Sequence, residues 1–135
     1  MINTTDENMK LSINSTVIEN GKVNIQFSSD GKKLYKVRIY LEGADLPFVE
    51  SVQYVLPPNI FEPNILDVER SFSNPTCELS VWTRFLFPIT IAVNTTDGES
   101  YIFQHNVNYQ EELKEYKQSQ NQNQSQSQID NLVLS

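Results

Sequence analysis

Cysteine, glycine and histidine are scarce in this chain. Its 135 residues include a single cysteine, Cys77, so an internal disulfide framework is excluded. Four glycines are too few for the Gly-rich loops that cradle phosphate groups. The only histidine is His105, and no cluster of His, Cys, Asp or Glu has the spacing of metal ligands. We therefore expect neither a metal nor a cofactor.

Positive charge and long apolar runs are also missing. The chain has 10 Lys and Arg against 17 Asp and Glu, a formal net charge of −7. Beyond Lys32-Lys33 there is no basic cluster, whereas phosphate binding needs several converging cations, so no nucleic-acid partner is expected. No apolar run approaches the roughly 18 residues of a membrane-spanning helix, and Met1–Leu11 does not resemble a secretion signal. We expect no membrane insertion and a cytoplasmic protein.

The length suits one domain with a core of its own. From Gln118 to Gln128 every residue is Gln, Ser or Asn, and such a segment has no apolar surface to offset the entropy lost on ordering. We therefore expect a folded domain over 1–109, a short helix over 110–117 and a disordered, low-complexity tail over 118–135. The helix would place Leu113 and Tyr116 on one side, and being short it would have to dock on the domain.

Apolar and polar residues alternate repeatedly along the domain, a pattern typical of half-buried β-strands. The alternation is clearest over 35–41, 52–56 and 87–93. Asp97-Gly98 between two such stretches is a strong hairpin signal, because a tight turn needs the positive φ that glycine supplies freely. These features predict an all-β protein, an immunoglobulin-like antiparallel β-sandwich of 7–8 strands, with no helix between Val23 and Leu56.

Trp82 is the most distinctive candidate for a binding residue. Leu79 and Val81 have the parity of core-facing residues, so Trp82 points to the opposite face of its strand. A large indole left in water is costly unless it has a use. The alternative is that a local bulge returns Trp82 to the edge of the core as a packing residue.

The remaining reactive residues have simpler structural interpretations. His105 shares its parity with Phe103 and Val107, as a satisfied core or rim residue would. Cys77 has no second cysteine to pair with and is expected to be a buried, inert thiol. The acidic groups Glu111/Glu112/Glu115 and Asp67/Glu69 are most simply solvated faces. No credible active site emerges, so we do not expect an enzyme; a hydrolase using Cys77 or His105 is the least favoured interpretation.

Two turns in the segment from Val52 to Val93 carry a resemblance to a known family. The first is Leu56-Pro57-Pro58-Asn59-Ile60-Phe61-Glu62-Pro63, and the second runs from Trp82 through Phe85 to Pro88. Their order and spacing resemble those of YEATS domains, in which a His-x-Ser/Thr-Phe-x-x-Pro turn is followed by an aromatic-small-Gly-Phe turn. The plain strands and the Asp-Gly hairpin are similar to those of the prokaryotic branch. The resemblance implies a small β-sandwich that binds a ligand at one loop end.

The same resemblance implies a set of site residues. In YEATS readers the aromatic at the position of Trp82 forms one wall of a slot for acylated lysine, and backbone N–H groups beside it hold the acyl carbonyl. Ungapped alignment puts Pro57, Asn59 and Ile60 at the family's His, Ser/Thr and second aromatic positions. Phe61 would supply a substitute wall if the loop shifts by one residue. Thr83 and Arg84 replace the small residue and the glycine, so we expect binding of acylated lysine to be weak or absent.

These observations lead to two functional hypotheses. The first is a non-enzymatic binding module that recognises a peptide, a modified side chain or a small ligand at its loop end. Its ligand-binding residues would be Pro57, Asn59, Ile60, Phe61, Trp82 and Thr83. The alternative is a structural adaptor that joins a larger effector or signalling complex through an edge strand or the apolar residues Leu132-Val133-Leu134 of the tail. Both imply a protein or peptide partner, and neither fixes the oligomeric state.

Overall fold

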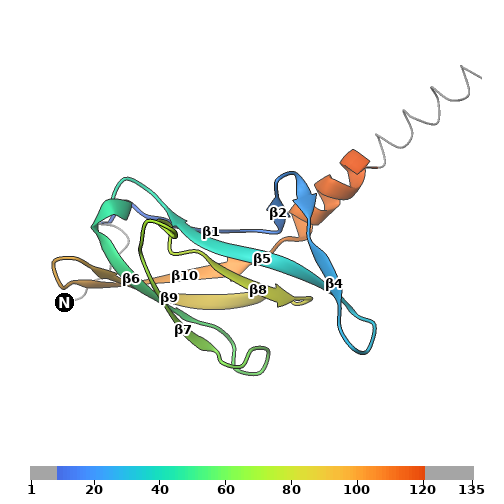
Figure 1. Ribbon diagram of the computed structural model, residues 1–135, viewed down its shortest axis with the longest axis horizontal. Coiled ribbons are helices and arrows are strands. Elements are labelled where there is room, and N and C mark those ends of the chain that lie inside the picture. The colour runs from blue at the N-terminus through green and yellow to red at the C-terminus, as the bar shows by residue number, and fades with distance from the viewer. Residues whose placement is uncertain (1–8, 121–135) are drawn as a thin grey trace, which may run out of the picture.

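The computed structural model describes residues 9–120, which form two facing four-stranded antiparallel sheets, a small two-stranded sheet and a C-terminal helix (Figure 1). The first sheet contains β1 (Ser12–Thr16), β4 (Ile25–Phe27), β5 (Lys33–Glu42) and β8 (Leu79–Thr83). The second contains β6 (Val49–Val55), β7 (Ile65–Glu69), β9 (Phe87–Thr95) and β10 (Ser100–Val107). The predicted all-β antiparallel sandwich is therefore confirmed, with eight strands in its two main sheets.

Strand β5 is the centre of the first sheet. Its residue Tyr35 pairs with Ile25 of β4 and with Thr83 of β8, while Ile39 pairs with Ser15 of β1 and with Leu79 of β8. A strand has two edges, so β1 and β4 lie end to end along one edge and β8 lies along the other. Between β1 and β4 the chain leaves the sheet to form a hairpin of β2 (Ile18–Glu19) and β3 (Lys22–Val23).

The second sheet has the order β10-β9-β6-β7. A turn after Thr95 joins β9 to β10, and Gly98 in that turn has φ of +87°. The predicted Asp97-Gly98 hairpin is therefore confirmed. A bulge between Val49 and Ser51 shifts the register of β6 against β9.

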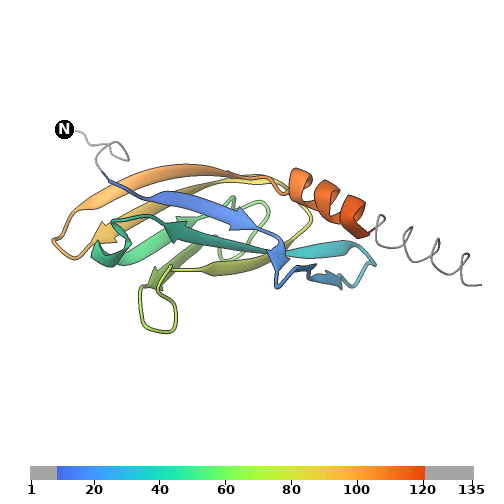
Figure 2. The ribbon, with the colours of Figure 1, turned by 90° about the horizontal axis from the view of Figure 1, so that it is seen from above.

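The core lies between the two sheets, which stack as separate layers when the molecule is viewed from above (Figure 2). On β5 the inward residues alternate with Lys36, Arg38 and Tyr40, and on β9 they alternate with small and polar residues. The inward residues of these two central strands are almost completely buried: Val37, Ile39, Leu41, Ile89, Ile91 and Val93. Burial of alternate residues on both strands is what the period-2 pattern predicts.

One turn of 3-10 helix, η1 (Leu46–Phe48), lies between β5 and β6, where we expected no helix. Pro47 stands at the start of this turn. Proline fixes φ near the helical value and has no N–H, so it fits the first turn of a helix, where N–H groups lack helical partners. This local effect is not visible in the strand periodicity.

The C-terminal helix covers residues 110–120 of the described part of the chain, three residues beyond the predicted end at Lys117. It docks on the sandwich as expected, with Leu113 packed against the core. Its Glu112 accepts hydrogen bonds from the Thr16 hydroxyl (2.6 Å) and the Val17 N–H (2.8 Å). The interpretation of Glu112 as a solvated residue is therefore wrong, because the helix lies directly over the end of β1. The rest of the predicted disordered tail, over 121–135, lies outside the described residues.

Candidate functional site

Trp82 lies on the outer face of the first sheet. It pairs across strands with Lys36 of β5, whereas its neighbour Thr83 is buried and pairs with Tyr35. The Trp82 side chain is 39% exposed. It points away from the core, as the alternation along β8 predicts. Strand β8 pairs with β5 in regular register, so the bulge that would have returned Trp82 to the core edge is not formed.

A concavity of about 680 Å³ lies beside the indole of Trp82. Lys36 of β5 and Asn24 lie next to each other, since the Lys36 N–H donates to the Asn24 carbonyl (3.1 Å). The β2–β3 hairpin supplies Glu19, Asn20 and Lys22 to the lining. The concavity therefore lies between the hairpin and the strand that carries Trp82.

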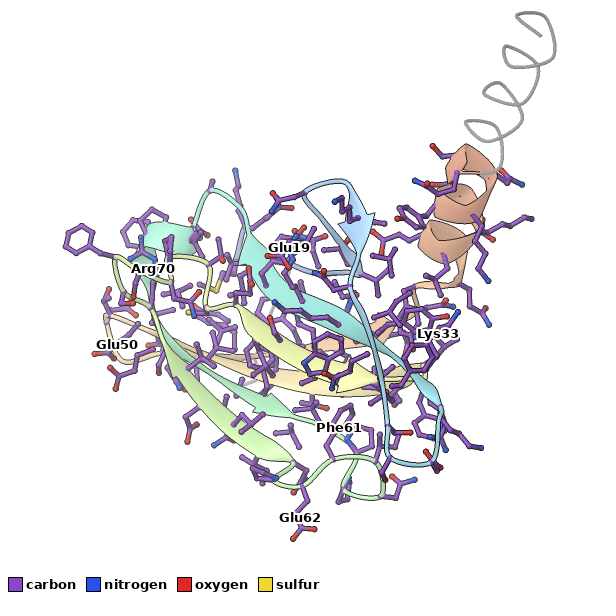
Figure 3. The ribbon with its side chains drawn as sticks, turned by 45° about the vertical axis from the view of Figure 1, so that its right-hand side comes forward. Glu19, Lys33, Glu50, Phe61, Glu62 and Arg70 are labelled. Atoms are coloured by element: carbon purple, nitrogen blue, oxygen red, sulfur yellow. The ribbon has the colours of Figure 1, made fainter. Side chains whose placement is uncertain are left out.

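Glu19 holds the hairpin to this face of the sheet. Its Oε1 accepts a hydrogen bond from Asn24 Nδ2 (3.1 Å) and pairs with Lys36 Nζ at 3.4 Å. The Arg38 guanidinium donates to the Ile18 carbonyl (3.1 Å) and pairs with Glu78 at 3.2 Å. Figure 3 labels Glu19 on the hairpin. The lining of the concavity therefore combines two apolar side chains, those of Trp82 and Ile25, with charged groups of both signs and amides.

The loop over 57–61 does not line the concavity beside Trp82. The Pro57 carbonyl accepts hydrogen bonds from the Ile60 N–H (3.2 Å) and the Phe61 N–H (3.1 Å). This turn packs Ile60 and Phe61 against the core. The Phe61 ring (Figure 3) meets the buried Phe87 ring edge-on, with centroids 4.8 Å apart. Asn59 remains exposed at the tip of the turn.

The structure therefore does not assemble the six predicted ligand-binding residues into one concavity. Trp82 stands in one place, Ile60 and Phe61 turn inward at another, and Thr83 is buried at 3% exposure. The physical reason is the burial of apolar surface, which draws a Phe onto an adjacent Phe in preference to leaving it as an open wall.

Two hydrogen bonds, one of them from Tyr109 beyond β10, hold the turn after β8. The Phe85 N–H donates to the Thr83 hydroxyl (2.9 Å), and the Tyr109 hydroxyl donates to the Phe85 carbonyl (2.9 Å). The Arg84 guanidinium lies 4.6 Å from the centroid of the Phe85 ring. The Phe85 N–H, which is one of the groups beside the aromatic, is therefore already occupied and does not serve as a free donor for an acyl carbonyl.

His105 and Cys77 have the structural surroundings expected for them. His105 Nε2 lies 2.8 Å from the Ser15 hydroxyl. This hydrogen bond links β10 to β1, where the edges of the two sheets meet. Burial lowers the pKa of His105. Cys77 is fully buried, and burial raises the pKa of its thiol to about 11. A thiol held in its neutral form is a poor nucleophile.

The β2–β3 hairpin is the part of the site that the sequence analysis missed. Its turn residues Asn20 and Gly21 both have positive φ, +55° and +77°. Asn-Gly is the preferred pair for the type I′ turn of a two-residue hairpin. The signal was therefore present in the sequence, but only the fold shows which face of the sheet this hairpin borders.

Over 9–120 there is no group of three His, Cys, Asp or Glu side chains placed to hold a metal ion. Within the same range no helix is both long and apolar enough to cross a membrane.

Comparisons with known proteins place the chain in a family. A search of curated proteins found no match. The family model described as the prokaryotic YEATS domain matches residues 35–108, from the third residue of the central strand β5 to the residue after β10. The match covers more than half of the chain and includes the turn at Pro57–Phe61 and the turn that follows Trp82. The chain therefore belongs to the prokaryotic YEATS domain family.

Proposed function

We propose that this YEATS-family domain is a non-enzymatic binding module that takes a segment of a protein or peptide into the concavity beside Trp82. The observation that carries the proposal is the 39% exposed indole of Trp82 on the outer face of a sheet, beside a concavity of about 680 Å³. Exposed tryptophan is the residue most able to concentrate binding energy in a small patch. The proposal retains Trp82 from the predicted set and replaces the loop over 57–61 with the β2–β3 hairpin.

The lining suggests the chemistry of the ligand. The indole offers a flat apolar surface for one planar or apolar side chain. Lys36, Glu19 and Asn24 offer a cation, an anion and an amide for the polar groups of a peptide backbone. An extended peptide with one aromatic or planar side chain fits this combination better than a highly charged ligand. Lys36 and Glu19 already neutralise each other at 3.4 Å, and Lys22 leaves the lining with a formal charge of only +1.

The proposal is tested by peptide selection followed by fluorescence. Peptides from a random library are selected on the wild-type domain after depletion on the Trp82→Ala variant. Because Trp82 is the only tryptophan, its fluorescence then reports the binding of each selected peptide directly. The matched control is Phe27→Ala, which removes another exposed aromatic, at 66% exposure, outside the concavity lining.

Selected peptides should shift the Trp82 emission of the wild type and of Phe27→Ala with saturation and similar affinity. Isothermal titration calorimetry, which needs no tryptophan, should show that Trp82→Ala no longer binds them. Truncation of such an aromatic anchor costs about 2–4 kcal/mol of binding free energy. A selection that yields no peptide dependent on Trp82, with the variant folded by circular dichroism, would reject this site.

A second candidate function, the structural adaptor, is favoured by Phe72. This residue is fully exposed in the connection between β7 and β8. The tip of the loop is closed by backbone hydrogen bonds from Ser71 to Asn74 (3.3 Å) and from Asn74 to Ser71 (3.1 Å). At its base the Asn74 side chain bonds the N–H (2.8 Å) and the carbonyl (3.1 Å) of Glu78. A rigid loop with an exposed Phe suits insertion into an apolar pocket of a partner protein.

The two candidates predict opposite results in a pull-down from the native cell. If the adaptor function holds, Phe72→Ala loses the partner and Trp82→Ala keeps it. If the peptide-binding function holds, the order is reversed.

A further inference from the structure

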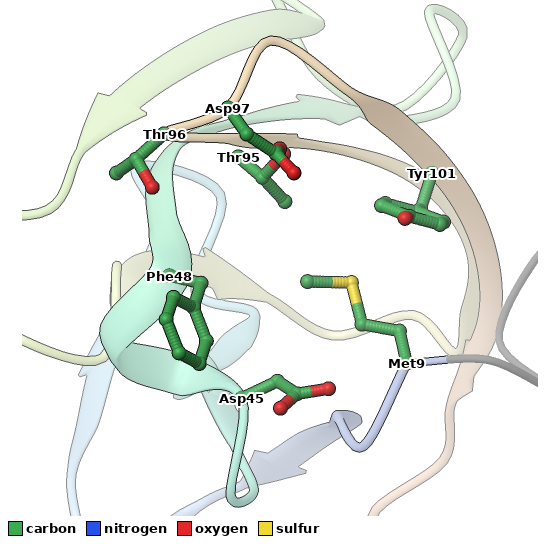
Figure 4. Close-up of a pocket in the computed structure, with 7 residues that line it drawn as sticks. All are labelled: Met9, Asp45, Phe48, Thr95, Thr96, Asp97 and Tyr101. Atoms are coloured by element: carbon green, nitrogen blue, oxygen red, sulfur yellow. The ribbon is translucent and has the colours of Figure 1, made fainter.

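A second cavity lies at the opposite end of the sandwich from Trp82. Its volume is about 430 Å³, and it is formed where Met9, η1 and the β9–β10 hairpin meet (Figure 4). Trp82 is near the start of β5 and β9, whereas this cavity lies at the ends of both strands. The inference drawn from it is therefore independent of the proposed function, which concerns a different surface.

Two carboxylates from separate parts of the chain border the cavity. Asp45 precedes η1, and its Oδ2 accepts a hydrogen bond from the Lys10 N–H (2.8 Å), which fixes the carboxylate in place. Asp97 lies in the β9–β10 turn and accepts hydrogen bonds from the Thr95 hydroxyl and from the Glu99 N–H. The Thr95 hydroxyl lowers the pKa of Asp97, so this carboxyl is ionised at neutral pH.

The rest of the lining is aromatic or soft. Figure 4 shows the Phe48 ring on one side, Tyr101 on the other and the Met9 thioether between them. Phe48 is 59% exposed, whereas Met9 is buried at 7% exposure. Among the described residues, no Lys, Arg or His lines this cavity. Aromatic faces and carboxylates both attract cations, and a thioether accepts the apolar stem of a ligand.

We infer that this cavity binds an alkylammonium group, presented either by a lysine side chain of a peptide or by a free amine. The Phe48 ring and the carboxylates of Asp45 and Asp97 would hold the ammonium, and Met9 and Tyr101 would pack on its alkyl stem. The volume is within the range of small-molecule sites. The net charge of −7 favours the approach of a cation over that of an anion.

The test uses the full chain and n-butylammonium chloride as the probe, with butan-1-ol as its neutral counterpart. Binding is followed by backbone amide shifts in two-dimensional NMR. Asp97→Asn removes a charge but keeps an oxygen to accept the hydrogen bonds of Thr95 and Glu99. Its matched control is Asp30→Asn in the β4–β5 turn, where the Ser28 hydroxyl bonds Asp30 in a similar arrangement. Phe48→Leu and Phe27→Leu form a second pair, one inside the cavity and one outside it.

Butylammonium should shift the amides of Phe48, Thr95 and Asp97 with saturation in the millimolar range, and butan-1-ol should not. Asp97→Asn should weaken binding by at least about fivefold, and Phe48→Leu by about two- to fivefold. Asp30→Asn and Phe27→Leu should leave it unchanged. A lysine-containing tripeptide and a free diamine are titrated in parallel. The probe that binds more tightly identifies the source of the amine.

Three results would overturn the inference: no saturable shift with butylammonium, equal shifts with butan-1-ol, or equal weakening by Asp97→Asn and Asp30→Asn. The last would mean that only net charge matters. The amide spectrum of each variant reports whether it is folded, so an unfolded variant is recognised before its binding is interpreted.

Discussion

The phenolic hydroxyl of Tyr54 donates a hydrogen bond of 2.6 Å to the carbonyl oxygen of Cys77. Tyr54 belongs to β6 of the second sheet, and Cys77 lies just before β8 of the first. Cys77 has φ of +54°, a left-handed conformation that costs a non-glycine residue free energy. The hydrogen bond therefore holds the connection that delivers β8, and with it Trp82, to the edge of β5.

Tyr54→Phe should destabilise the domain because it leaves the buried Cys77 carbonyl without this donor. We expect a loss of about 1–3 kcal/mol in the free energy of unfolding, measured by urea denaturation. Tyr116→Phe on the C-terminal helix is the matched control and should change stability by less than about 0.5 kcal/mol. Equal stability of the two variants would show that the Tyr54 hydroxyl is not needed.

The Cys77 thiol should resist alkylation in the native state. Burial raises its pKa from 9.0 to about 11, so the reactive thiolate is rare at neutral pH. Since the folded pKa is above the unfolded one, the contribution to stability is complete below about pH 9 and is lost as the pH rises toward 11. Iodoacetamide labelling at pH 8, followed by mass spectrometry, should be slow in buffer and fast in urea. Rapid labelling of the native domain would contradict the burial.

His105 should make the domain less stable in acid. Burial lowers its pKa below the ordinary 6.5, so the folded state favours the neutral ring. The contribution to stability is present above about pH 6.5 and is lost as the pH falls through the folded pKa, because the unfolded chain binds the proton first. Urea denaturation of wild type and His105→Gln between pH 7.5 and 5 should show a smaller decline for the variant. Identical declines would assign the acid sensitivity to carboxyl groups alone.

Glu112 should anchor the C-terminal helix. Its carboxylate accepts hydrogen bonds from Thr16 and Val17 at the end of β1. Glu112→Ala removes both, and bonds to charged groups contribute roughly 1.5–3 kcal/mol each at most. We expect a loss of about 1–3 kcal/mol in stability together with reduced helical signal at 222 nm. Glu111→Ala, the exposed neighbour on the same helix, should have little effect; similar losses for both would indicate a general effect of helix charge.

Acylated lysine should bind weakly or not at all. The Phe61 ring packs against Phe87, and the Phe85 N–H is occupied by the Thr83 hydroxyl, so the second wall and one donor of an acyl-lysine slot are absent from the described structure. Isothermal titration calorimetry with acetylated and crotonylated peptides should show no saturable binding at micromolar concentrations. A micromolar isotherm that is lost in Trp82→Ala would refute this expectation.

Much of the fold could be predicted from local pattern. Alternation along 35–41 and 87–93 identified the central strands and the residues that face the core, and Asp97-Gly98 marked the hairpin. The same parity argument gave the outward direction of Trp82. These properties follow from the period of a β-strand and from turn geometry, which depend on residues close together in the chain.

Only the tertiary structure decided which residues from distant parts of the chain contact one another. Ile60 and Phe61 turn inward because the buried Phe87 is within reach. Glu112 accepts hydrogen bonds at the end of β1 because the C-terminal helix passes over that end. Likewise, the sequence marks Asn20-Gly21 as a turn, but the position of that hairpin beside Trp82 depends on the pairing of β4 and β8 with opposite edges of β5. The sequence by itself determined the main strands, their core face and the outward parity of Trp82. It did not determine which residues come together at the site, since contacts between residues distant in the chain depend on the packing of the whole domain.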